Sequence, residues 1–157
     1  MASPADSLTD DDLLAQQVAD HLLAAEGTSG PWGVEIEAAR VGYARLRMAV
    51  LDTMTNGLGT IHGGMIFALA DTAFAYACNS RNEAAVAASA SIIFLAPARV
   101  GEVLVAEAVE NAVSGRTGSY SVAVRTADGR PVAQFQGQSR TIGGAVIELG
   151  DRENGNG

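Results

Sequence analysis

The stretch that decides the fold is GGMIFALADTAFAYACNS, residues 63–80. Apolar side chains lie on almost every side of it, and many of its residues are small alanines or other good helix formers. A helix that is apolar nearly all round is buried on most of its sides. Its most apolar part, residues 65–78, is interrupted by Asp71 and is shorter than the roughly 20 apolar residues that span a bilayer. We therefore predict a long buried helix around which the rest of the chain folds.

Segments on both sides of this helix have the patterns of strands. In residues 42–51, for example, Tyr43, Arg45 and Arg47 alternate with apolar residues. Before them, Thr9 or Asp10 can cap a helix whose first turn is acidic. The expected elements are a helix at residues 8–26, strands at 33–38 and 42–51, a loop at 52–61, and further strands at 85–97, 102–113, 117–127 and 131–142.

This order of elements predicts an α+β fold. A length of 157 residues fits one domain, with an antiparallel sheet of about six strands wrapped around the buried helix and an additional N-terminal helix. We expect the domain to occupy residues 8–145, with flexible tails at 1–7 and 146–157. Strands and helices do not alternate along the chain, which disfavours a doubly wound nucleotide-binding fold.

The acidic composition limits the possible partners. The formal net charge is −8, so we expect no nucleic acid and no membrane surface as partner, since both need a basic face. The charge is unevenly placed: residues 1–26 hold six acids and no arginine, whereas the rest of the chain has a net charge of only −2. The first residues lack the pattern of a signal peptide, and we expect a cytoplasmic protein.

The predicted helix places a carboxylate, Asp71, among apolar neighbours. No arginine or lysine lies within four residues of it. A buried carboxylate costs several kcal/mol unless it is paired or hydrogen-bonded, and desolvation makes it more basic. Asp71 is therefore either a general base or nucleophile in a water-poor site, or a structural carboxylate bonded to a neighbouring strand or subunit.

The residues before this helix read NGLGTIHGG, 56–64. Gly63 and Gly64 fall at the helix N-terminus, where free backbone N–H groups can hold a carbonyl oxygen that gains negative charge. The two glycines can also serve only to allow a tight junction. His62 either bonds the substrate or fixes the loop, and Asn56 either orients a water or the loop or is a turn residue.

Other chemistries have little support in the sequence. The single cysteine, Cys78, rules out a disulfide within the chain and a zinc site of several cysteines, and it has no neighbouring base, so we expect it to be structural. The sequence contains no HExxH, P-loop, GxGxxG or GxSxG motif. We expect no metal and no dinucleotide cofactor.

The run NGLGTIHGGMIFALADTAFAYACNSR, residues 56–81, resembles the hotdog-fold acyl-CoA thioesterases of the phenylacetate-degradation type. The resemblance extends to ASIIFLAPARVGEVL at 90–104, GRTGSY at 115–120 and QGQSRTIGG at 136–144. In that family two subunits pair so that their sheets continue each other, and dimers usually pair again. The resemblance therefore implies a homotetramer, a dimer of dimers, with active sites at subunit interfaces.

The resemblance also implies roles for these residues. Asp71 is the catalytic carboxylate, the Gly63 amide polarises the thioester carbonyl with Gly64 beside it, and Asn56 and His62 organise the site. Some relatives hold the attacking water with a Ser or Thr at the position that is Ala87 here. Alanine cannot hold a water in this way, so Thr72 is the candidate for that role in this chain.

The activity implied is hydrolysis of an acyl-CoA thioester to the free acid and CoA. The acyl group would be phenylacetyl, hydroxylated phenylacetyl, or a related aryl or medium-chain group. Asp71 either activates a water or attacks the carbonyl directly, and CoA is the substrate, with no separate cofactor. Two alternatives stay open: a hydratase or dehydratase that uses His62 with Asp71, and a non-catalytic acyl-CoA-binding subunit.

Substrate contacts beyond the reacting group are harder to place. Three arginines at loops or strand ends can meet the phosphates of CoA, although each can also be a solvated surface residue: Arg81, Arg99 and Arg116. Four side chains of the long helix are candidates for the wall of the acyl pocket or for core packing: Met65, Phe67, Phe74 and Tyr76.

Overall fold

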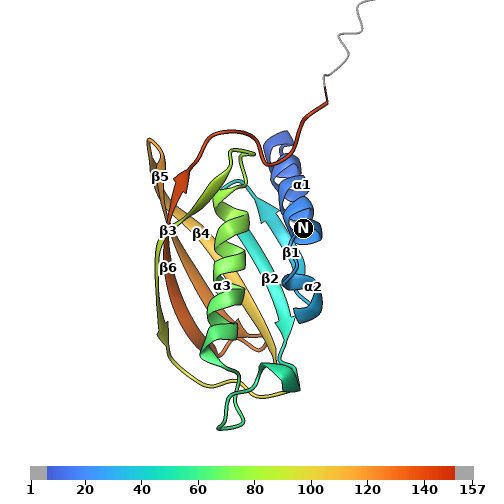
Figure 1. The fold of residues 1–157 in the computed structure, drawn as a ribbon, viewed down its shortest axis with the longest axis vertical. Helices are drawn as coiled ribbons and strands as arrows, with labels where there is room; N and C mark the ends of the chain where they lie inside the picture. The colour runs from blue at the N-terminus through green and yellow to red at the C-terminus, as the bar shows by residue number, and fades with distance from the viewer. Residues whose placement is uncertain (1–6, 151–157) are drawn as a thin grey trace, which may run out of the picture.

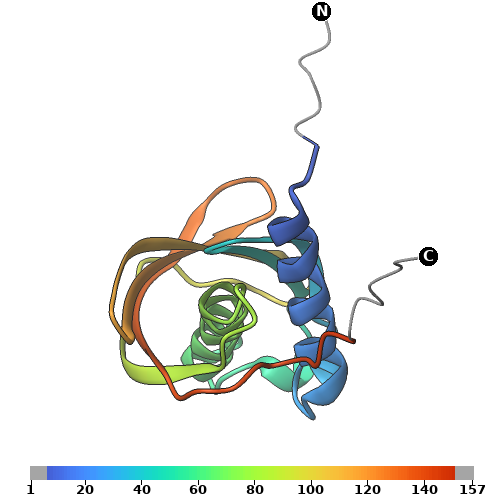
Figure 2. The ribbon, with the colours of Figure 1, turned by 90° about the horizontal axis from the view of Figure 1, so that it is seen from above.

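One sheet curls around one helix in this protein (Figures 1 and 2). The computed structural model describes residues 7–150. The six strands are antiparallel in the order β1-β2-β4-β5-β6-β3, and α3 lies in the concave face of their sheet. The predicted α+β fold, its six strands and its N-terminal helix are confirmed. The elements are α1 (Asp10–Ala25), α2 (Ser29–Trp32), β1 (Glu35–Arg40), β2 (Tyr43–Ala49), a 3₁₀ turn (Asp52–Met54), α3 (Gly63–Cys78), β3 (Ala85–Phe94), β4 (Val103–Ser114), β5 (Thr117–Thr126) and β6 (Pro131–Thr141).

The buried face of α3 forms the centre of the core. Its residues recur at the helical spacing of three and four, which places them on one side of the helix against the sheet. Residues on the opposite side of α3 are only partly covered by the chain, and Asp71 is one of them. The core face consists of Ile66, Leu69, Ala70, Ala73, Phe74 and Ala77.

An aromatic cluster fills the space between α3 and the far end of the sheet. The Phe74 ring lies 5.4 Å from Tyr120 and 5.8 Å from Phe135, centroid to centroid, and Phe67 meets Phe135 edge to face. Gly137 of β6 lies directly under these rings. A Cβ atom at Gly137 would come within 2.9 Å of Phe135 and 3.0 Å of Phe74. The close approach of β6 to α3 therefore requires a glycine at this position.

Replacement of this glycine tests the packing. We expect Gly137→Ala to lower the free energy of unfolding by about 1–3 kcal/mol, because both rings are buried and the new methyl forces them out of their positions. Gly27→Ala is the matched control, since nothing lies within 4 Å of its added Cβ. Urea denaturation of both variants measures the difference. Equal stability of the two variants would contradict the tight packing at β6.

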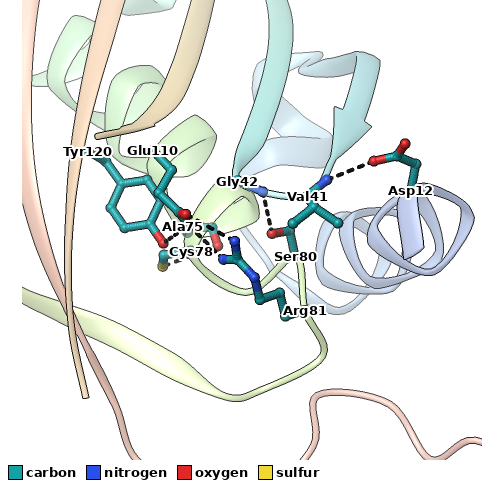
Figure 3. A network of polar contacts seen from close by, with 9 residues as sticks. All are labelled: Asp12, Val41, Gly42, Ala75, Cys78, Ser80, Arg81, Glu110 and Tyr120. Atoms are coloured by element: carbon teal, nitrogen blue, oxygen red, sulfur yellow. Dashed lines mark hydrogen bonds and ion pairs between the residues drawn. The ribbon is translucent and has the colours of Figure 1, made fainter. Parts of the chain in front are cut away.

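The two edges of the sheet differ. At one edge, α1 covers β1 and bonds its backbone: the Ala39 N–H donates to Gln16 Oε1 (3.1 Å), and the Val41 N–H beside it donates to Asp12 Oδ1 (3.1 Å, Figure 3). At the other edge, no strand of the described residues pairs with the outer side of β3. Apolar side chains of β3 are nonetheless exposed, with 64% of Ile93 and 52% of Phe94 accessible. An unpaired apolar edge is a template for pairing with another chain.

Several local details differ from the expectations. Residues 29–32, predicted only to end the first helix, form a short helix of their own, which Pro31 tolerates because first-turn N–H groups have no intrahelical partner. The predicted loop at 52–61 contains a 3₁₀ turn. The strand expected at 85–97 ends at Phe94, so residues 95–97 leave the sheet.

The segment after β6 crosses the C-terminal end of α3. Asn82, in the left-handed region with a φ of 59°, holds it there. Its Oδ1 accepts from the N–H groups of Val146 and Ile147 (3.0 and 2.9 Å), and its Nδ2 donates to the Ile147 carbonyl. These bonds lie inside the predicted flexible tail at 146–157. Residues 151–157 of that tail, and 1–6 of the predicted N-terminal tail, are outside the described residues. No helix between residues 7 and 150 is long and apolar enough to cross a membrane.

Candidate functional site

The loop before α3 is organised by Asn56. Its Oδ1 accepts from the N–H groups of Leu58 (2.9 Å) and Thr60 (3.2 Å), and its Nδ2 donates to the Thr60 hydroxyl (3.0 Å). Both ends of the amide side chain are thus used within the loop. The expected organising role of Asn56 therefore has a geometric basis, because its bonds close the turn that leads to His62.

His62 caps α3 and uses one of the two glycine amides. The ring Nδ1 of His62 accepts from the Gly64 N–H (2.8 Å), and the backbone N–H of His62 donates to the Met54 carbonyl (2.7 Å). Among residues 7–150 no hydrogen bond engages the Gly63 N–H. Of the two glycines predicted to hold a carbonyl oxygen, Gly63 thus keeps a free donor at the positive end of the helix dipole.

An open apolar hollow lies beside Gly63. Its volume is about 330 Å³. Residues from three segments line it: the loop before α3, the first turn of α3, and the chain that follows β3. The lining residues are Asn56, Ile61, Gly63, Ile66, Phe94, Leu95, Ala96 and Pro97. Gly63, which carries the free amide, therefore lies on the wall of a mostly apolar hollow.

Asp71 lies two turns further along α3 and is partly buried. Burial raises the pKa of its carboxyl above the ordinary value. Within the described part of the chain, no hydrogen bond or ion pair satisfies this carboxylate. A structural carboxylate bonded to a neighbouring strand, the alternative from the sequence, is therefore not what this chain shows. Asp71 follows Gly63 by eight positions, which corresponds to about 12 Å along the helix axis.

Other predicted contacts on α3 are engaged in packing. The Thr72 hydroxyl donates to the Ala68 carbonyl (2.8 Å) and is buried, so it is committed to the helix backbone. Phe67 is only partly buried and packs against Phe135. Phe74 and Tyr76 lie in the core, and the Tyr76 hydroxyl donates to Glu26 at the end of α1. Tyr76 thus ties the two long helices together.

The three predicted arginines have different surroundings. Arg81 donates twice to Glu110 (2.6 and 3.0 Å), which in turn accepts from Tyr120 (Figure 3). This pairing lowers the pKa of the Glu110 carboxyl. Arg116 donates through Nε and Nη2 to the Thr141 carbonyl. Both arginines therefore already have partners.

Arg99 differs, because its guanidinium has no bonded partner among the described residues. It follows the segment that lines the hollow, and the Ile61 N–H fixes that segment by donating to the Ala98 carbonyl (2.8 Å). Arg130, which the sequence did not single out, braces the same turn with bonds to the Pro97 carbonyl and to Glu102 (2.8 Å each).

Cys78 lies at the end of α3 and is partly buried. Burial raises the pKa of its thiol to about 12, with a smaller contribution from the negative charge of Asp71. At neutral pH it is a thiol and a weak nucleophile. This agrees with the expectation that Cys78 is not catalytic.

The sequence did not identify the walls of the hollow. Phe94, Leu95 and Pro97 were assigned to a strand, and only their position after a long apolar run signalled a change of direction at Pro97. Phe94 and Gly63 are close in space but 31 positions apart in the sequence, so no local sequence pattern predicts their contact.

Comparisons with known proteins agree with the fold. The pattern of the Thioesterase superfamily matches residues 58–133, which includes Gly63 and Asp71. Acyl-coenzyme A thioesterase PaaI of Escherichia coli (strain K12) is 42% identical over 114 residues, which are 73% of this chain and 81% of that protein.

Two solved structures are similar over most of the chain. The PaaI protein from the phenylacetic acid degradation operon of E. coli superposes with a TM-score of 0.84 at 38% identity, covering 85% of this chain and 97% of that one. A mutant of the phenylacetic acid degradation protein PaaI from Thermus thermophilus gives a TM-score of 0.72 at 34% identity, covering 74% and 100%. The chain belongs to the thioesterase superfamily, in the hotdog-fold group of the phenylacetate-degradation type.

Proposed function

We propose that this protein hydrolyses acyl-CoA thioesters, with phenylacetyl-CoA, its hydroxylated forms and related aryl or medium-chain thioesters as substrates. The observation that carries the proposal is the combination of a free Gly63 N–H at the start of α3 and an unpaired, partly buried Asp71 two turns later. Its relative in E. coli is named as an acyl-coenzyme A thioesterase.

The geometry supports a simple hydrolytic scheme. The thioester carbonyl oxygen accepts from the Gly63 N–H, and the helix dipole stabilises the negative charge that develops on it. In one route Asp71 takes a proton from a water whose oxygen attacks the carbonyl carbon, the C–S bond breaks, and the proton passes to the leaving CoA sulfur. In the other route Asp71 attacks the carbonyl carbon itself, the C–S bond breaks to release CoA, which takes a proton from water, and a second water hydrolyses the resulting acyl-aspartyl anhydride to the free acid. A raised pKa makes Asp71 a stronger base than an exposed carboxylate.

The proposed scheme requires a second copy of the chain. Gly63 and Asp71 of one chain are about 12 Å apart along α3, too far for both to face one carbonyl group closely. The unpaired apolar edge of β3 provides a surface on which another subunit can pair. We therefore place each active site between two subunits, with Gly63 from one and Asp71 from the other. A cytoplasmic dimer of dimers completes the proposal, with acyl-CoA as its ligand and no metal or redox cofactor.

Release of free CoA tests the proposed function. A thiol reagent should detect CoA from phenylacetyl-CoA, hydroxyphenylacetyl-CoA, benzoyl-CoA or straight-chain acyl-CoAs when wild-type protein is added. Absence of turnover across the whole panel would contradict the proposal. Hydration of crotonyl-CoA without thiol release would indicate the hydratase alternative that uses His62 with Asp71. Tight acyl-CoA binding without turnover would indicate a non-catalytic binding subunit.

Arg99 is the arginine that we expect to meet the CoA phosphates, because its guanidinium is unpaired and follows the lining of the hollow. Arg99→Ala should raise the KM for acyl-CoA about 3–10-fold and leave kcat nearly unchanged, as for loss of one exposed charge contact. Arg116→Ala is the matched control, since its guanidinium is bonded to the Thr141 carbonyl. Steady-state kinetics in low salt measures both. A KM for Arg99→Ala that equals the KM of wild type and of Arg116→Ala would remove Arg99 from the phosphate site.

A further inference from the structure

The ring of Phe94 is seated on the first residue of α3. A Cβ atom on Gly63 would lie 3.1 Å from Phe94 Cζ and 3.3 Å from Cε1, so the ring tip occupies the space that a side chain at Gly63 would need. The glycine thus has a second role beside the one at its N–H, because it allows an aromatic ring to pack against the helix N-terminus.

The strand geometry explains why this ring points into the hollow. Side chains alternate between the two faces of a strand, so Phe94 shares its face with Ile92, which packs against the core. Ile93 points to the other face and is 64% exposed. Phe94 is the last residue of β3, and the chain turns away at Leu95 to form the rest of the wall. The ring therefore lies against Gly63 on the wall of the hollow.

The Phe94 ring is exposed enough to contact a ligand. Phe94 is 52% exposed, unlike the fully buried Phe74 and Phe135, so core packing does not account for its position. The lining around it is apolar, with Ile61, Ile66 and Leu95, which suits an acyl chain or an aromatic ring rather than a polar group.

We propose that the Phe94 ring is the wall that determines which acyl groups the hollow accepts, an inference that rests on the proposed thioesterase function. An acyl group whose carbonyl oxygen is bound at the Gly63 N–H extends past this ring into the hollow. The size of residue 94 then sets the size of the acyl group that reaches the productive position. Phe94 is in this sense a specificity-determining residue.

Two substitutions of opposite size test the proposal. We expect Phe94→Ala to raise the ratio of kcat/KM for octanoyl-CoA to that for butyryl-CoA about tenfold, since pocket contacts of one or a few methylenes discriminate by such factors. Phe94→Trp should shift the ratio in the other direction. Val109→Ala, at an exposed apolar residue of β4 that does not line the hollow, is the matched control and should keep the wild-type ratio.

The outcomes separate the two proposals. If wild-type protein hydrolyses none of the thioesters, the proposed function fails. If it is active and neither Phe94 variant changes the chain-length ratio relative to Val109→Ala, the role of Phe94 is overturned. Phe94→Leu replaces Phe94→Ala if the smaller side chain changes the elution volume in size-exclusion chromatography.

A double-mutant cycle tests the contact itself. Gly63→Ala keeps the N–H but pushes on the ring, so its cost in kcat/KM should be smaller in the Phe94→Ala background than in wild type. Additive effects would show that the ring and the glycine act independently and would overturn the contact-based account.

Discussion

Asp71→Asn should lower kcat for thioester hydrolysis by about 10²–10⁴-fold, the usual effect of losing a general acid–base group. Asparagine has nearly the same shape as aspartate but can neither take a proton from water at neutral pH nor act as a carboxylate nucleophile. Because no described residue bonds the Asp71 carboxylate, the substitution breaks no hydrogen bond or ion pair within residues 7–150. The loss should therefore appear in kcat, with acyl-CoA binding retained. Single-turnover and steady-state thiol release measure it.

The melting temperature of Asp71→Asn separates a catalytic role of Asp71 from a structural one. Burial raises the pKa of this carboxyl in the folded state, so folding favours the protonated form. The stabilisation linked to protonation is fully present below the unfolded pKa and is lost as pH rises through the folded pKa. At neutral pH the ionised group thus gives the fold no such support, and Asp71→Asn should melt at the same temperature as wild type or higher.

Asp52→Asn provides the control for this pair of measurements. Asp52 is an exposed acid in the 3₁₀ turn before the site loop, and we expect full activity and an unchanged melting temperature. Full activity of Asp71→Asn would remove the carboxylate from the mechanism. Loss of activity together with a large fall in melting temperature would instead indicate a structural role.

The central helix could be predicted because its signal is local. Residues 63–80 are apolar on nearly every side, and α3 is found at Gly63–Cys78. The strands were also placed within a few residues, because buried and more exposed side chains alternate along several of them, as in β2 and β5. Asp71 stood out for the same reason: a carboxylate within an apolar run is visible without any knowledge of its neighbours in space.

Contacts between distant segments could not be predicted in this way. Arg81 and Arg116 looked available for phosphates, but their partners Glu110 and Thr141 lie 29 and 25 residues away in the sequence. Pairing across such distances depends on the register of β4 and β6, which residue patterns do not specify. The wall at Phe94 was missed for the same reason.

The uneven charge has a partly structural explanation. Asp12, one of the six acids in residues 1–26, both caps α1 with Thr9 and accepts from the Val41 N–H (Figure 3). These bonds lower the pKa of its carboxyl. The acidic N-terminal segment thus contains a carboxylate that fixes α1 on the β1 edge, which leaves β3 as the open edge of the sheet.

Gly63→Pro is expected to lower kcat by about 10²–10³-fold, as for loss of one oxyanion donor. Gly63 is the first residue of α3, a position where proline is favoured because its N–H has no intrahelical partner. His62 has an extended backbone with φ −64° and ψ 134°, which a following proline requires. The variant thus removes the N–H and preserves the helix. Gly63→Ala keeps the N–H and introduces a Cβ at the same place, so it should lose far less activity.

Mixing these inactive proteins decides whether the site is shared between subunits. If Gly63 and Asp71 of one site come from different chains, a hybrid of Asp71→Asn and Gly63→Pro subunits contains one site with neither substitution and one with both. Random exchange makes half of the dimers hybrids, so co-refolded protein should regain about a quarter of wild-type activity. Two copies of Asp71→Asn refolded together are the control and should stay inactive.

Absence of recovery, with exchange verified by differently tagged subunits, would place both groups of each site in a single chain. Recovery would explain why Asp71 has no hydrogen-bond or ion-pair partner among residues 7–150: the carboxylate is positioned for a substrate held by the Gly63 amide of the neighbouring subunit.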